Sequence, residues 1–305
     1  MIRVYCAGGT GGNIGKQLTD LDLDVCFIDT SSSNLSGVSS ELVFLTEGLD
    51  GAGKRRATTY DAFKGLAEDV LIRFKPARTL NVVISSLSGG SGSVIAPLIT
   101  KELIKNGFNT IVIGIESVNS VIEIDNCIKT LKTYKLVTDT TGKSVSLFHI
   151  PGQARQTADE QAIYFINLLS LLMDKSKTDE FDTSDIHNYI NFPDVTDNPA
   201  SVSLIEVNRN EVIVPEKNTA IVGTILLTAN RNNTISETMP EYISTCVVTD
   251  KSYKTEDLRI DNILGKLAII IEGLDKLKQS YQDYKKVNKY KEPDIGPATS
   301  DDVVL

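Results

Sequence analysis

The sequence has few of the residue types that mark several common classes of protein. It contains no tryptophan and only two histidines, which disfavours a histidine-rich metal centre, and no protein-held metal site is predicted. None of its cysteines form a C-x-x-C pair. Three of the four lie in apolar runs, so we expect free, buried thiols instead of disulfides: Cys6, Cys26, Cys127 and Cys246.

The chain also has no excess of basic residues and no long apolar run. Its 40 acidic residues outnumber 31 basic ones, for a net charge of −9, and this argues against binding nucleic acid through a basic face. The longest apolar run, Ala162 to Met173, is too short to span a bilayer. The chain opens on a strand-like run, so we expect no cleavable leader, no membrane contact and a cytoplasmic location.

Short apolar runs alternate with helix-like runs through the first half of the chain. This alternation predicts an α/β fold, a Rossmann-like parallel sheet with helices on both faces. Ligands of such sheets lie at the carboxyl ends of the strands. The predicted strands are Ile2 to Cys6, Val25 to Ile28, Leu42 to Leu45, Leu80 to Ile84, Ile111 to Ile115 and Ser144 to Ile150. The predicted helices start near Gly12 and span Thr59 to Phe74, Val94 to Asn106 and Val121 to Leu136.

Three glycine loops follow three of these strands. The loop from Ser85 to Ser93 combines three glycines with five serines between a strand and a helix, where free helix N–H groups favour an anion. Two further loops lie around Gly9 and Gly51. A dinucleotide fold needs one such loop, whereas three suggest a mononucleotide triphosphate held mostly by backbone N–H groups.

Two familiar nucleotide motifs are approached but not completed. A strict dinucleotide fingerprint fails because Ile14 stands where the third glycine belongs. A looser form with Gly9, Gly11 and Gly15 fits, with Asp29 as the ribose acid, and leaves a nicotinamide-dependent oxidoreductase as an alternative. The stretch from Gly48 to Arg55 approaches a P-loop but lacks the Ser or Thr after the lysine, so it is rejected as one.

The second half of the chain has a different pattern. A helix from Ala158 to Asp174 is apolar nearly all round, which predicts a central buried helix. Strands are then predicted at 202–207, 212–214, 220–227 and 243–248, in a smaller α+β domain. A last helix from Thr255 to Lys291 carries a 4-3 seam, which either packs on its own domain or forms a dimeric coiled coil: Ile263, Leu267, Ile270, Leu274, Leu277, Tyr281 and Tyr284. The predicted parts are a nucleotide-binding domain (1–156), central helix (157–178), second domain (179–254), and C-terminal helix with an extended tail (255–305).

The glycine loops give the chain a specific resemblance. Ser88 to Val94 is similar to the Gly-Gly-Gly-Thr-Gly-Ser/Thr-Gly loop of the tubulin/FtsZ superfamily of GTPases, with the first and last glycines replaced. Within that superfamily the chain resembles the short tubulins of large phages (the PhuZ type), through to about Lys291. The resemblance implies GTP or GDP as ligand, with Mg²⁺. It also implies that loops containing these residues hold the nucleotide: Gly8, Gly9, Thr10, Gly11, Gly12, Asn13, Asp50, Gly51, Ala52, Gly53, Lys54, Ser88, Gly89, Gly90, Ser91, Gly92 and Ser93.

The same resemblance assigns the remaining contacts. Glu123 matches the ribose carboxylate, although the arginine that follows it in the family is Cys127 here. Guanine recognition is expected from Asp159, with Glu160 as second choice, at the start of the central helix; an ordinary acidic first helical turn remains the alternative.

The resemblance also implies a site shared between subunits. Asp182 and Asp185 match acids that catalyse hydrolysis of the neighbouring subunit's GTP, although without the family Asp182 would be taken for a helix N-cap. The implied partner is the chain itself, in a head-to-tail filament with tail contacts through Asp301 and Asp302, or else the tail is solvated with no role. The implied function is a GTPase filament that positions phage DNA or the replication compartment in an infected bacterium. A plasmid-segregation tubulin is a third hypothesis, beside the oxidoreductase.

Overall fold

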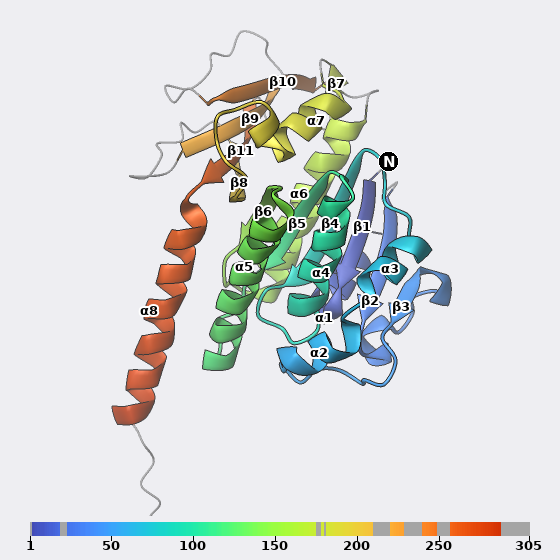
Figure 1. Cartoon of the computed structure of the whole chain (residues 1–305), viewed down its shortest axis with the longest axis vertical. Coiled ribbons are helices and arrows are strands. Elements are labelled where there is room, and N and C mark those ends of the chain that lie inside the picture. Colours follow the sequence, from blue (N-terminus) through green and yellow to red (C-terminus); the bar gives the residue numbers. More distant parts are fainter. Residues whose placement is uncertain are drawn as a thin grey trace, which may run out of the picture.

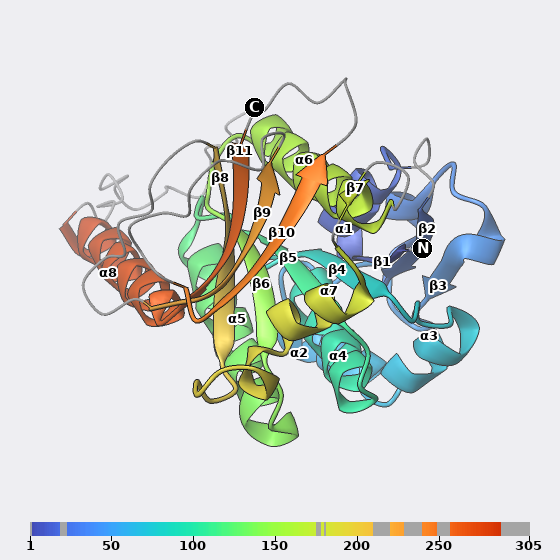
Figure 2. The ribbon, with the colours of Figure 1, turned by 90° about the horizontal axis from the view of Figure 1, so that it is seen from above.

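The computed structural model describes residues 2–18, 23–174, 178–179, 181–209, 220–228, 240–248 and 257–287. The described strands form one sheet in the order β3-β2-β1-β4-β5-β6-β8-β11-β9-β10-β7 (Figures 1 and 2). The strands are β1 (Ile2–Ala7), β2 (Asp24–Asp29), β3 (Val43–Leu45), β4 (Leu80–Ser86), β5 (Thr110–Ile115), β6 (Val145–Ile150), β7 (Thr178–Asp179), β8 (Val202–Arg209), β9 (Ala220–Thr228), β10 (Tyr242–Val248) and β11 (Asp257–Leu264).

Helices cover both faces of this sheet. Successive residues of a strand point to opposite faces, so Val4 and Cys6 of β1 join one apolar cluster while Tyr5 and Ala7 join another. Helices α1, α6 and α7 pack on the first face, and α2 to α5 with α8 pack on the second. The helices are α1 (Gly8–Gly15), α2 (Arg56–Phe63), α3 (Ala67–Arg73), α4 (Gly92–Lys105), α5 (Val121–Thr141), α6 (Arg155–Met173), α7 (Thr183–Ile190) and α8 (Lys266–Val287).

The sheet is parallel from β3 to β8, and its strand order reverses between β1 and β4. Strand β1 lies between β2 and β4, so the connections leave its two sides in opposite directions. In open parallel sheets a crevice forms at the carboxyl ends of the strands where this reversal occurs. The predicted Rossmann-like α/β class is confirmed, and the predicted central helix is present as α6, with eight of its 19 residues buried.

The second half of the chain extends the same sheet. Strand β8 pairs in parallel with β6 at Val145↔Val202, and β11 lies between β8 and β9. The strands predicted at 202–207, 220–227 and 243–248 are present, whereas 212–214 lies outside the described residues. The domain boundaries expected from the sequence stay predictions. The strands of both halves of the chain are joined by hydrogen bonds in one sheet.

The prediction of one helix from Thr255 to Lys291 is wrong at its start. The described part of that range begins with strand β11, in which Leu258, Ile260 and Ile263 are buried between β8 and β9. Gly265 then turns the chain with a positive φ of 80°, and α8 follows. Ile263 therefore matched the helical seam by coincidence, because pairing with neighbouring strands outweighed its local pattern.

The seam of α8 packs on the chain's own domain over its first turns. Leu267 and Leu274 are buried in the cluster formed with α5 and β8, and Leu277 packs against it. Tyr281 and Tyr284 lie further along and are exposed. Of the two alternatives for this helix, packing on its own domain therefore holds for the half nearest the sheet.

Two smaller helix predictions are also corrected. The stretch from Thr59 to Phe74 forms α2 and α3 separately, because the chain turns at Gly65 with a positive φ of 87°. Helix α1 begins at Gly8, directly after β1, instead of near Gly12. The earlier start matters for the site, because it places the first N–H groups of α1 at the carboxyl end of β1.

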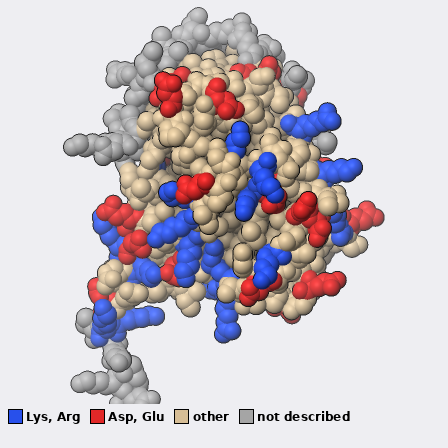
Figure 3. Space-filling model, in the orientation of Figure 1, with Lys and Arg blue, Asp and Glu red and all other residues tan. Residues whose placement is uncertain are grey.

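None of the described helices has both the length and the apolar content that a bilayer crossing requires. On the face seen in Figure 3, acidic and basic side chains are interspersed.

Candidate functional site

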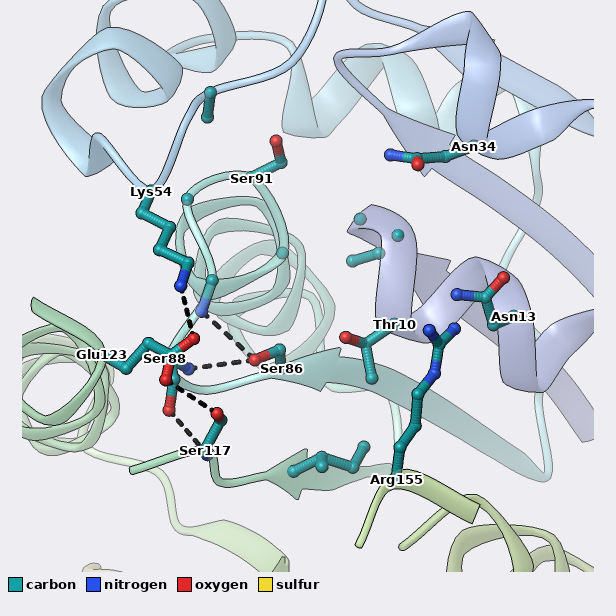
Figure 4. A pocket seen from close by; sticks show the side chains of 18 of the residues that line it. Thr10, Asn13, Asn34, Lys54, Ser86, Ser88, Ser91, Ser117, Glu123 and Arg155 are labelled. Atoms are coloured by element: carbon teal, nitrogen blue, oxygen red, sulfur yellow. Dashed lines mark hydrogen bonds and ion pairs between the residues drawn. The ribbon is translucent and has the colours of Figure 1, made fainter. Parts of the chain in front are cut away.

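A cavity of about 660 Å³ opens at the carboxyl ends of β1, β4 and β5. Figure 4 shows its lining: α1 on one side, the loop before α4 behind, and the starts of α5 and α6 on the remaining sides. Its position is where the reversal of strand order predicts a ligand. The size suits a small organic ligand such as a nucleotide.

The glycine loops around the cavity touch one another through their backbones. A Cβ on Gly8 would lie 2.6 Å from the backbone N of Gly92, and one on Gly90 would lie 3.0 Å from the Cα of Lys54. Gly8 also has a positive φ of 69°, which side-chain-bearing residues rarely adopt. These glycines are therefore required for three loops to converge on one space.

Replacing Gly8 with alanine is expected to disrupt this convergence. The added Cβ would collide with backbone atoms of Gly92, and we expect a loss of about 1–3 kcal/mol of stability together with loss of ligand binding. Gly12→Ala is the matched control within α1, since its nearest neighbour would lie at 3.9 Å, and we expect it to stabilise the chain by about 0.5–1 kcal/mol. Urea unfolding of both variants measures the contrast, and equal effects would contradict the assigned packing.

The loop before α2 is fixed to α5 at its backbone. Lys54 has a φ of 63° and is the one non-glycine residue in the left-handed region among those the structure describes. The Asn126 side-chain amide donates to the carbonyl oxygens of Lys54 at 3.0 Å and Ser88 at 3.2 Å. Asn126 thus joins two of the three loops to one helix, a role that the spacing of the sequence did not reveal.

Glu123 occupies the cavity wall as an ionised carboxylate. It accepts hydrogen bonds from Lys54 Nζ at 2.6 Å, Ser117 Oγ at 2.9 Å and the Asn119 backbone N–H at 3.0 Å. Burial opposes ionisation, but the hydrogen bonds from Lys54 and Ser117 outweigh it and hold the pKa of Glu123 below its usual value. A charged acceptor is therefore present where a ribose hydroxyl is expected.

Asp159 enters the cavity from the first turns of α6. Its side chain is 13% exposed and lies 3.9 Å from Arg155 Nε, and burial raises its pKa despite that cation. Its Oδ1 is buried without a hydrogen-bond partner. Such an atom costs free energy unless a ligand donates to it, so Asp159 is available to accept from a bound molecule. Glu160 is exposed, accepts from Gln156 and does not line the cavity.

Phage tubulin-like proteins are similar to the chain in sequence. The chain is 38% identical to a phage tubulin-like protein of Pseudomonas phage PhiPA3 over 194 residues, and 30% identical to that of Pseudomonas phage 201phi2-1 over 194 residues. Those matches cover 62% of this chain, and the chain spans only 61% and 60% of the two relatives. No family model matches the sequence.

Solved structures resemble the chain over its whole length. The GDP complex of the phage tubulin PhuZ superposes with a TM-score of 0.87 at 21% identity, covering 100% of this chain and 99% of that one. A TubZ protofilament subunit from bacteriophage PhiKZ gives 0.86 at 21% identity, covering 100% and 97%. The chain has the tubulin/FtsZ fold. The resemblance to phage tubulins is thereby confirmed, in sequence over part of the chain and in fold over all of it.

Most residues predicted to hold the ligand line the cavity of this tubulin fold. Gly11, Gly12, Asp50 and Ser93 do not: the two glycines pack inside α1, Asp50 accepts a hydrogen bond from Ser31 at 2.8 Å, and Ser93 Oγ donates to the Gly89 carbonyl. They shape the loops without facing the cavity. The predicted residues that line it are Gly8, Gly9, Thr10, Asn13, Gly51, Ala52, Gly53, Lys54, Ser88, Gly89, Gly90, Ser91, Gly92, Glu123 and Asp159.

Several lining residues were missing from the predicted set. Ser86 lies inside the predicted loop from Ser85 to Ser93, and most of the others follow the carboxyl end of a strand, which was the available signal. The sequence carried no such signal for Arg155, because the approach of its side chain to the cavity depends on how α6 crosses the sheet. The additional lining residues include Ser31, Asn34, Ser86, Glu116, Ser117, Asn119, Gln153 and Arg155.

Asp29 is not placed to act as the ribose acid that the dinucleotide-binding alternative requires. Its carboxylate accepts from the Thr30 backbone N–H at 2.6 Å and from Asn34 Nδ2 at 2.8 Å, and the residue is 1% exposed. It is absent from the cavity wall. Because both oxygens are occupied inside the protein, Asp29 holds the following loop in place and is not available to a ribose.

Asp182 and Asp185 lie at the opposite end of the sheet from the cavity. Helix α7, which they begin, contacts Asn109 just before β5 through His187 Nδ1 at 2.9 Å, whereas Ser117 of the cavity follows the other end of β5. The six residues of β5 separate these ends by about 20 Å. Figure 1 shows α7 beyond the amino ends of the strands. These acids therefore do not reach the cavity of their own chain.

The two acids form a capping box at the start of α7. Asp182 Oδ1 accepts from the backbone N–H groups of Ser184 at 2.7 Å and Asp185 at 3.1 Å, and Asp185 Oδ2 accepts from the Asp182 N–H at 2.8 Å. The N–H groups of Asp185 and Ser184 hold the pKa of the exposed Asp182 below its usual value. The N-cap reading of the sequence is thus correct, and it leaves an exposed, ionised carboxylate on this face.

Proposed function

We propose that this chain binds GTP in the cavity, assembles head to tail into filaments, and hydrolyses the GTP between successive copies. The observation that carries the proposal is the buried, unpartnered Oδ1 of Asp159 in a cavity otherwise walled by three glycine loops. The loops offer backbone N–H groups to phosphates. The carboxylate suits guanine, whose N1–H and N2–H can both donate to it, whereas adenine presents an acceptor at N1.

The bound phosphates would be accompanied by Mg²⁺. Among the described residues there is no group of three His, Cys, Asp or Glu side chains arranged to hold a metal ion. Mg²⁺ commonly keeps several waters and binds through substrate phosphates. The ion would neutralise charge on the phosphates, while residues of this chain position the nucleotide.

Hydrolysis would require two copies of the chain. The cavity and the Asp182–Asp185 capping box lie at opposite ends of the sheet, so a head-to-tail contact brings the acids of one copy toward the cavity of the next. There the carboxylates would orient and polarise the attacking water. A heterologous contact that does not close produces a filament, so assembly and turnover would be coupled.

The similar proteins support a proposal about the cellular role. The relatives are phage tubulin-like proteins, and the similar structures include a protofilament of one and a filament of another. We propose that this chain forms filaments in the cytoplasm of an infected bacterium and positions phage DNA or the replication compartment. The tail residues Asp301 and Asp302, outside the described part of the chain, are proposed to contact a neighbouring copy.

Assembly in the presence of GTP tests this function. We expect GTP and Mg²⁺ to produce sedimentable filaments that later disassemble, and a slowly hydrolysed GTP analogue to produce filaments that persist. The measurement is light scattering followed by pelleting. Absence of assembly, together with binding of NADPH, would replace the proposal with the oxidoreductase alternative.

A shortened chain tests the tail contact separately. Removal of residues 294–305 is expected to raise the concentration needed for assembly while GTP binding by dilute chain stays the same. Unchanged assembly would show that the tail is solvated and has no role in the filament.

A further inference from the structure

Helix α7 packs on two strands from the second half of the chain. Its Tyr189 ring lies against Gly223 of β9, where an added Cβ would come within 3.2 Å of the ring. Gly223 is paired with Tyr242 of β10, whose ring would lie 3.5 Å from the same Cβ. Figure 1 shows α7 beside these strands. The missing side chain at Gly223 therefore lets two tyrosine rings hold α7 against β9 and β10.

Two hydroxyl groups of β10 bind the Asp185 carboxylate at the start of α7. Its Oδ1 accepts hydrogen bonds from Ser244 Oγ at 2.8 Å and from Tyr242 Oη at 3.2 Å. Tyr242 and Ser244 are two residues apart on one strand, so their side chains point to the same face of the sheet. Burial raises the pKa of Tyr242, so its hydroxyl stays protonated and able to donate. Strand β10 thus presents two donors to one carboxylate oxygen.

These donors determine an orientation that the capping box leaves open. The Asp182 N–H donates to Asp185 Oδ2 at 2.8 Å. That bond alone would let the carboxylate turn, because the terminal torsion of aspartate has broad preferences. Donors on both oxygens define the plane of the group. A carboxylate offers about four acceptor positions, so the three donors found among the described residues leave about one position for water.

We propose that Tyr242 and Ser244 are positioning residues for hydrolysis, which aim the Asp185 carboxylate at the water that attacks the nucleotide of the next copy. This inference rests on the proposed function. Neither hydroxyl touches the nucleotide, and both act through Asp185. Orientation matters here because a reacting group misplaced by about 1 Å can cost about 100-fold in rate. The end of the chain that supplies the acids is thus built by α7 and β10 together.

The test measures phosphate release divided by the mass of sedimented polymer, with full-length chain and saturating GTP. Tyr242→Phe, which keeps the ring on Gly223, and Ser244→Ala are each expected to lower turnover about two- to threefold, because the other hydroxyl still binds Oδ1. The double variant is expected to lose about tenfold or more. GTP binding by dilute chain and the concentration needed for assembly should stay the same, since the cavity lies at the other end of the sheet.

An Asp185→Asn background separates positioning from a structural role. There the double substitution in β10 should cause no further loss of the residual turnover, because the carboxylate on which both hydroxyls act is already absent. Thr245→Val is the matched control on the same strand, since it removes a hydroxyl that points to the opposite face of the sheet. Its turnover should be normal.

Normal turnover in the double variant would overturn the inference, and so would an equal loss with and without Asp185→Asn. If the double variant does not fold, the two single variants are compared in the same two backgrounds, and normal turnover in both would likewise overturn it. Filaments of the unmodified chain that release no phosphate would instead overturn the proposed function.

Discussion

Replacing Asp182 with asparagine is expected to lower GTP turnover by about 100-fold or more while filaments still form. The carboxylate is exposed at the end of the sheet opposite the cavity, and hydrogen bonds keep it ionised. Asparagine caps a helix about as well as aspartate, so α7 should remain intact. The variant therefore removes the negative charge and preserves the capping geometry, which Asp182→Ala would not. The measurement is phosphate release divided by the mass of sedimented polymer.

Asp194→Asn is the control for loss of one charge near α7, since Asp194 is exposed and its described ion pair is with His187. We expect its turnover per polymer to be normal. Normal turnover in Asp182→Asn would instead remove the acid from the catalytic assignment.

Mixed filaments test whether the site is divided between copies. The Asp182→Asn chain would supply an intact cavity, and an Asp159→Asn chain would supply an intact acid. We expect a mixture to turn over GTP faster than the sum of the two variants alone. Strictly additive rates would show that each chain hydrolyses its nucleotide without its neighbour.

Replacing Asp159 with asparagine is expected to weaken GTP binding by about 100-fold and to favour xanthosine triphosphate instead. A carboxylate accepts from both N1–H and N2–H of guanine, whereas an asparagine accepts from N1–H and donates to the 2-oxo group of xanthine. The unpartnered Oδ1 is the structural basis for this expectation. Competition binding with GTP, xanthosine triphosphate and ATP measures the change.

The exposed neighbour offers the control for Asp159. Glu160→Gln should leave the order of nucleotide affinities unchanged, because Glu160 does not line the cavity.

The pKa of Asp159 is raised by burial, and its protonated form cannot accept both guanine N–H groups. GTP binding by the unmodified chain should therefore decline as the pH falls through that raised pKa. Unaltered GTP affinity in Asp159→Asn would assign guanine recognition elsewhere.

The sequence alone was sufficient for the alternating α/β architecture and for the loops of the cavity. Parallel strands buried on both faces need continuous apolar residues, and close contacts between backbones need glycine, so both leave local patterns. Gly8, Gly90 and Gly92 were identified from such a pattern, and the contacts between their backbones explain why no larger residue fits. The acids at Asp182 and Asp185 were selected by resemblance, since their local pattern indicates only a helix cap.

Tertiary structure decided what depends on contacts between distant residues. Strand β11 replaced the start of a predicted helix because β8 and β9 flank it, and Asn126 joins two loops from more than 30 residues away in sequence. The partners of Asp29 turned a possible ribose acid into a support for its loop. Local spacing carries no information about such partners. For the same reason, only the folded chain shows that the cavity and the acids lie at opposite ends of one sheet.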